Sequence, residues 1–141
     1  METHSPLLLP AAVLVAWTLV MWLWMYATRI PAIQRAKMRL DPDAPRGQQM
    51  AELPAPVRWK ADNYNHLLEQ PLLFYVLLWV LERVGADGPL VLVMAWSYVA
   101  LRVIHSLVQA LGNRIEVRFA VFVLSNLPLL VLTVVAITKL R

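Results

Sequence analysis

A tyrosine and three polar side chains recur at helical spacing inside an apolar stretch, at Tyr98, Arg102, His105 and Gln109. At ~100° per residue they fall within an arc of roughly 60°, so they share one face of a helix. An arginine deep in a bilayer costs ~2.5–3.5 kcal/mol unless it faces a protein interior or a wet cavity. The spacing therefore predicts a polar stripe that lines a cavity.

Arg102 also has a purely structural interpretation. A buried ion pair between Arg102 and Glu69 would satisfy both charges and only brace the bundle. For Arg102 alone, the structural interpretation and the cavity interpretation are equally supported. For the whole stripe, the cavity interpretation is favoured.

A second polar group precedes Pro71 on the helix predicted to face this stripe. Its members are Asp62, Asn65, His66 and Glu69. Asn65 and Glu69 are expected to lie deepest and to need partners, whereas Asp62, Asn63 and His66 are expected at the membrane border. Pro71 has no N–H for the carbonyl of Leu67, which predicts a bend in the helix beside these residues.

Arg114 and Arg118 stand four residues apart, where the last apolar run begins. Arg118 is the last charge before the bilayer, and it has two interpretations. It could extend to lipid phosphates, or its guanidinium could bind a carboxylate or stabilise a thiolate. Because the chain contains no cysteine, a thiol in this site would belong to a substrate.

Other kinds of site find little support in the sequence. The three histidines are scattered, and the pair His66–Glu69 alone is a weak metal signal, so no metal site is predicted. The chain also has no glycine-rich phosphate loop and no serine elbow.

The composition indicates a membrane protein, since 60% of the 141 residues are hydrophobic. Runs at 6–27, 89–111 and 119–138 are each long enough to cross a bilayer, which takes ~20 residues. The run 70–81 spans only if its helix extends back through Asn65 and Glu69. The first run exceeds a signal-peptide core and has no basic leader, so a permanent span is expected.

We therefore predict an all-α integral membrane protein, a four-transmembrane-helix bundle in a single domain over 1–141. The expected helices cover about 6–28, 57–84, 89–111 and 114–139. A proline-rich cytoplasmic loop over about 29–56, with one short helical piece at its start, joins the first two.

Basic residues are distributed unequally between the two sides. Nine Lys and Arg fall on the side of the long loop and the 112–114 turn, and three fall on the other. The positive-inside rule puts the nine in the cytoplasm and both termini outside it. The net charge of +4 is thus explained by membrane topology rather than by nucleic-acid binding.

The residues described above resemble the MAPEG superfamily, the membrane-associated proteins of eicosanoid and glutathione metabolism. The similarity rests on Arg102-Val-Ile-His105 followed by Arg118, and on the run 63–75, NYNHLLEQPLLFY, in a form seen in bacterial members. It extends over essentially the whole chain. It implies a homotrimer of four-helix subunits in a bacterial inner membrane, with glutathione held between subunits at the cytoplasmic side.

The resemblance also implies roles for individual residues. Arg118 would stabilise the glutathione thiolate as the catalytic residue, Arg29 would contact glutathione, and Asn65 would match the family asparagine. The thiol-binding set implied in full is Arg29, Asn65, Glu69, Arg102, His105, Gln109 and Arg114. Glutathione would be a co-substrate, and the electrophilic partner would be lipophilic.

The chain departs from the eicosanoid synthases at several positions. Ala61 and Tyr64 stand where arginines occur, Gln109 replaces a tyrosine, and Phe119 replaces a serine. These departures motivate an alternative, a non-catalytic lipid-binding or scaffold protein of the same superfamily. The leading expectation is a membrane-bound glutathione transferase or peroxidase acting on lipophilic electrophiles or lipid hydroperoxides. A transporter that uses Arg102 and Glu69 as a relay is a third hypothesis, weakened by the lack of an internal repeat.

Overall fold

The computed structural model describes residues 5–141, and within that range every regular element is a helix. The helices are α1 (Leu8–Arg35), α2 (Gln48–Ala51), α3 (Ala55–Glu69), α4 (Pro71–Arg83), α5 (Pro89–Leu111) and α6 (Ile115–Leu140). The prediction of an all-α chain is confirmed.

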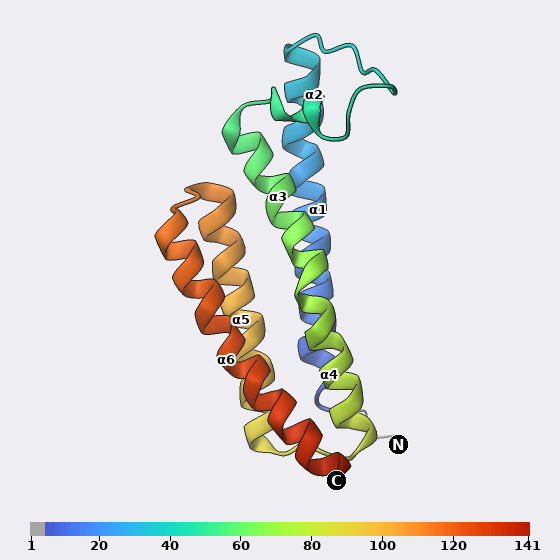
Figure 1. Ribbon diagram of the computed structural model, residues 1–141, viewed down its shortest axis with the longest axis vertical. Coiled ribbons are helices and arrows are strands. Elements are labelled where there is room, and N and C mark those ends of the chain that lie inside the picture. The colour runs from blue at the N-terminus through green and yellow to red at the C-terminus, as the bar shows by residue number, and fades with distance from the viewer. Residues whose placement is uncertain (1–4) are drawn as a thin grey trace.

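The long helices run side by side as an elongated bundle (Figure 1). α3 and α4 follow one another as a single column that packs along α1, while α5 and α6 form a close hairpin. The loop with α2 lies at the same end of the bundle as the α5–α6 turn, which we call the loop end. The C-terminus lies at the opposite, far end.

α1 is longer than expected and ends at Arg35 rather than near residue 28. Pro31 lies inside it, where it removes one backbone donor from the ladder. This occurs in the part of the helix that carries Arg29 and Arg35, beyond the apolar run. The added turns are the short helical piece predicted at the start of the loop.

The column of α3 and α4 is interrupted where Pro71 predicts a bend. α3 ends at Glu69 and α4 begins at Pro71. Gln70 between them keeps helical angles, φ −64° and ψ −37°, so the chain continues in the same general direction. The break thus leaves the Gln70 side chain at the junction of two helices.

Three helices are long and apolar enough to cross a membrane: α1, α5 and α6. α3 and α4 have 15 and 13 residues, so each is shorter than a span. The fourth predicted span over 57–84 requires both together and stays a prediction.

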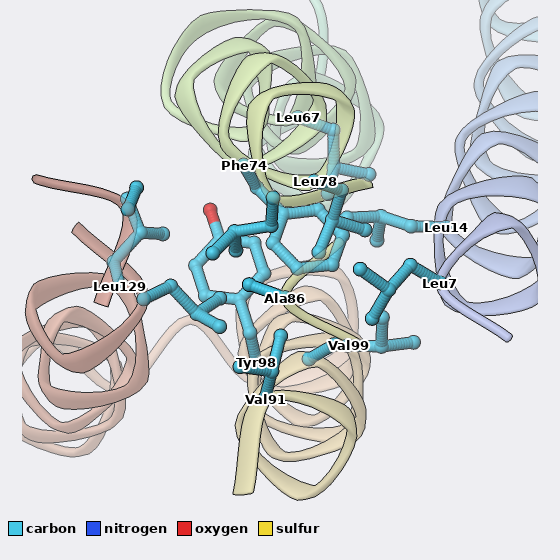
Figure 2. Packing of buried hydrophobic residues seen from close by; sticks show 14 of the residues in the cluster. Leu7, Leu14, Leu67, Phe74, Leu78, Ala86, Val91, Tyr98, Val99 and Leu129 are labelled. Carbon is cyan, nitrogen blue, oxygen red and sulfur yellow. The ribbon is translucent and has the colours of Figure 1, made fainter. Parts of the chain in front are cut away.

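The apolar core lies toward the far end, and Figure 2 shows side chains from several helices pointing into it. Phe74 of α4 stacks on Tyr98 of α5 with ring centroids 4.5 Å apart. Leu14 of α1 and Leu132 of α6 are fully buried in the same cluster. This core fixes the relative positions of the helices that carry the polar residues above it.

Candidate functional site

A cavity of about 490 Å³ opens between α3, α5 and α6 near the loop end. It is lined by Asp62, His66, Glu69, His105, Gln109, Ile115, Arg118, Phe119 and Phe122. Four of the predicted site residues, Glu69, His105, Gln109 and Arg118, therefore meet in one space, which gathers cationic, acidic, amide and aromatic groups.

The stripe on α5 lies inside the protein, as its spacing predicted. Tyr98 and Arg102 are 0% exposed, His105 is 2% and Gln109 is 6%. His105 and Gln109 line the cavity, whereas Arg102 lies behind it. His105 Nδ1 and Gln109 Oε1 have no hydrogen-bond partner within the described chain. Buried polar atoms of this kind are normally paired, so these two are available to a ligand or water.

Arg118 is half-buried at the loop end of the cavity, and the turn before α6 holds it. Its Nη1 donates to Asn113 Oδ1 at 2.6 Å. Asn113 has a left-handed backbone (φ 46°), a conformation that asparagine tolerates better than most residues. Because Asn113 is neutral, its hydrogen bond orients the guanidinium without cancelling its charge.

Three rings form the inner wall of the cavity. The centroid of His66 lies 4.9 Å from that of His105 and 5.3 Å from that of Phe122. His105 and Phe122 are 6.1 Å apart. These rings come from α3, α5 and α6, so the wall exists only when all three helices are in register.

The structural interpretation that pairs Arg102 with Glu69 is wrong. Arg102 donates to Gln70 Oε1 at 3.2 Å and to the His66 carbonyl at 3.3 Å. Glu69, with its side chain 72% exposed, approaches His66 Nδ1 at 3.4 Å instead. One residue is ~100° of helix rotation, so Gln70 faces α5 where Glu69 faces outward.

The two asparagines of α3 exchange their expected environments. Asn65, predicted to be deep, is exposed and lies outside the cavity. Asn63, predicted at the border, is 0% exposed, and neither carboxamide atom has a partner in the described chain. The family role that the resemblance assigns to Asn65 therefore finds no support from cavity geometry within one subunit.

Arg29 and Arg114 also lie outside the cavity. Arg29 is half-buried on α1. Arg114 lines a separate hollow of about 400 Å³ beside Leu107 and Val108. Two of the basic residues in the predicted thiol-binding set thus do not line the cavity that Arg118 lines.

Lys60 is buried, although the sequence indicated it only as one of the nine basic residues on the loop side. Its Nζ donates to the Ala110 carbonyl at 3.1 Å and to the Pro56 carbonyl at 2.8 Å. It also lies 5.2 Å from the centre of the Trp24 ring. A cation at the C-terminus of α5 opposes the partial negative charge of that helix end. The sequence pattern that could have indicated its burial is helical spacing. Lys60, Asn63, Leu67 and Phe74 follow one another at intervals of three, four and seven residues, and all four are buried.

Gln70 and Asn126 are polar residues whose role the sequence did not indicate. The Gln70 carboxamide bonds to both Arg102 and Asn126. Their pairing depends on the register between α6 and the α3–α4 junction, which periodicity within one helix does not report.

The arrangement offers electrostatic chemistry rather than a metal centre. Within residues 5–141 no three His, Cys, Asp or Glu side chains gather as a metal site would need. Arg118 presents a fixed positive charge at the mouth, and the rings present an apolar and weakly polar surface further in. A space of this kind can hold an anionic nucleophile next to a lipophilic partner.

Comparison with known proteins identifies the family. A family model described as the MAPEG family matches residues 7–138. No curated protein and no solved structure matches the chain. With that match over nearly the whole chain and three helices able to cross a membrane, the chain belongs to the membrane-bound MAPEG family.

Proposed function

We propose that the protein is a membrane-bound thiol transferase or peroxidase that uses glutathione, or a related thiol, against lipophilic electrophiles or lipid hydroperoxides. Family membership supports the general chemistry. The observation that carries the proposal is Arg118, which Asn113 holds half-buried at the mouth of a cavity with an aromatic inner wall.

Arg118 would act by stabilising the thiolate. A neighbouring cation lowers the pKa of a thiol, and the thiolate is the nucleophile. In the transferase reaction the sulfur bonds to the electrophilic carbon, a leaving group such as chloride departs with its electron pair, and the thiol proton passes to water. In the peroxidase reaction two thiols reduce one hydroperoxide, giving a disulfide, an alcohol and water.

The remaining groups would bind and orient the substrates. Gln109 and His105 offer unpartnered polar atoms within the cavity. Glu69 and Asp62 on the opposite wall can accept hydrogen bonds from an amino group. Phe119 and Phe122 give the lipophilic partner an apolar surface next to the thiolate.

A homotrimer would complete the site from neighbouring subunits. Asp62, Asn65 and Glu69 are exposed along one side of α3. If α3 and α4 form the fourth span, this polar side cannot face lipid without cost, and a second subunit can cover it. Arg29, Asn65 and Arg114 could then reach a ligand held between subunits.

The sidedness of the site follows from its charges. The cavity lies at the loop end, where the basic residues concentrate, and the positive-inside rule places that end in the cytoplasm. We propose from this charge distribution that both termini lie on the non-cytoplasmic side, and from the resemblance to bacterial members that the membrane is a bacterial inner membrane.

The proposal is tested with protein purified in detergent. Glutathione should raise the melting temperature, because ligand binding to the folded state stabilises it by RT ln(1 + [L]/Kd). Turnover is followed with an activated aryl chloride and with a lipid hydroperoxide. Arg118→Ala should lower kcat/KM about 100-fold, the effect typical of removing one fixed donor to a developing anion.

Arg58→Ala is the matched control, because Arg58 is an exposed arginine near the same end and outside the cavity. Unaltered turnover in Arg118→Ala would refute the catalytic role of Arg118. Lipid that co-purifies without any thiol-dependent stabilisation would instead favour the lipid-binding or scaffold alternative.

A further inference from the structure

The side chains of Gln70 and Asn126 connect three helices next to the cavity. Arg102 Nη1 of α5 donates to Gln70 Oε1 at 3.2 Å, and Gln70 Nε2 donates to Asn126 Oδ1 of α6. Asn126 Nδ2 then donates to the Phe122 carbonyl at 2.8 Å. We call this series of hydrogen bonds the carboxamide relay.

The direction of the relay is fixed at both ends. A guanidinium only donates hydrogen bonds, and a backbone carbonyl only accepts them. Each group between them must accept on one side and donate on the other. The carboxamides of Gln70 and Asn126 meet this requirement, and aliphatic side chains of similar size do not.

The relay lies about one helical turn beyond the inner wall on each helix. Gln70 follows His66 by four residues, and Asn126 follows Phe122 by four. Arg102 precedes His105 by three on α5, which runs in the opposite direction. The relay therefore supports the His66, His105 and Phe122 rings from the far-end side of the cavity.

The charge of Arg102 makes the relay necessary. Arg102 is 0% exposed, and no carboxylate within the described residues lies at ion-pair distance from it. Among residues 5–141, the acceptors of its Nη atoms are Gln70 Oε1 and the backbone carbonyl of His66. Because a buried cation demands acceptors, these bonds determine where α5 and the α3–α4 junction meet.

We propose that Gln70 and Asn126 are positioning residues that hold the inner wall of the cavity in register for the lipophilic substrate. They act through Arg102 and through the backbone of His66 and Phe122. This inference rests on the proposed function, but it concerns the inner end of the cavity, whereas Arg118 and the thiol occupy the mouth. Loss of the relay should therefore weaken binding of the lipophilic substrate and leave thiol binding intact.

The test compares Gln70→Leu, Asn126→Leu and the double variant in detergent. Each single variant should raise KM for the aryl chloride about tenfold, which equals ~1.4 kcal/mol of lost positioning, with a smaller change in kcat. The double variant should be no worse than either single one, because either change interrupts the series of bonds between Arg102 and Phe122. The melting-temperature gain with glutathione should match that of the wild type in all three.

Three further variants separate positioning from general damage. Exchanging the two side chains, Gln70→Asn with Asn126→Gln, preserves both carboxamides and their summed length. The KM of this exchange variant should lie close to that of the wild type, whereas Gln70→Asn alone should raise KM. Thr133→Val is the control on α6, because Thr133 Oγ1 donates to the Leu129 carbonyl of its own helix and takes no part in the relay. It should leave KM unchanged.

Different failures have different meanings. Additive losses in the double variant, an unchanged KM in the single variants, or no recovery on exchange would overturn the relay. A wild-type protein that neither gains stability with glutathione nor turns over substrate would overturn the proposed function as well.

Discussion

The two ends of the bundle are held together in different ways. At the far end, Phe74, Tyr98 and their aliphatic neighbours pack without direction-dependent contacts between side chains. Toward the loop end, Arg102, Gln70 and Asn126 join the same helices by hydrogen bonds of defined polarity. In a bilayer, apolar contacts between helices gain little over contacts with lipid, so shape complementarity must hold the far end. The loop end contains an open cavity and is therefore packed less completely, so its helices are aligned by hydrogen bonds.

The far end should be the more sensitive to loss of volume. Phe74→Ala removes a fully buried ring from the stack with Tyr98 and leaves a cavity. We expect the free energy of unfolding to fall by roughly 3–5 kcal/mol, the range for such truncations. An SDS titration of the folded fraction measures it. Trp79→Ala on the exposed side of α4 is the control, and an equal loss there would show that the stack has no special role.

Lys60 should have an intermediate effect, because it joins the helices at the loop end through one cation. Lys60→Met keeps the aliphatic length but removes the hydrogen bonds to Ala110 and Pro56. We expect unfolding to become easier by about 1–2 kcal/mol, from lost charge-assisted bonds and the helix-end interaction. Arg58→Met, an exposed cation two residues away, is the comparison and should lie near wild type in the same titration.

Arg102 should have the smallest effect on stability despite its complete burial. Arg102→Met removes the relay's donor, but it also removes the cost of burying a cation that has no carboxylate partner in the described part of the chain. The two contributions oppose each other, so we expect a change within ~1 kcal/mol. Turnover of the lipophilic substrate should nevertheless fall. A loss of stability as large as that of Phe74→Ala would mean that both ends depend on their interior contacts equally.

The sequence indicated the helices and the α5 stripe because isolated polar residues contrast with an apolar background. Arg102, His105 and Gln109 could be assigned to one buried face from spacing alone. The run Asn63-Tyr64-Asn65-His66 gave no such contrast, since adjacent polar residues point in different directions around α3. The buried asparagine was therefore assigned incorrectly. The interpretation that paired Arg102 with Glu69 was wrong for a related reason. It rested on opposite charge alone, whereas the rotation of the helix directs Gln70 toward α5 and Glu69 away from it.

The contacts that join helices were harder to predict. Gln70, Asn126 and Lys60 each bond to a group more than 30 positions away in the chain. Their partners depend on the vertical offset between neighbouring helices, which packing over the whole bundle determines. A single sequence reports which face of a helix is buried, but not the level at which that face meets the next helix.

Asn113 combines two requirements at one position, and this limits its evolution. The left-handed backbone favours glycine, asparagine or aspartate. Glycine would keep the turn but lose the acceptor for Arg118, and aspartate would keep the acceptor but place a negative charge against the guanidinium. Asparagine alone meets both demands. A saturation library at this position, selected for activity, should therefore converge on asparagine.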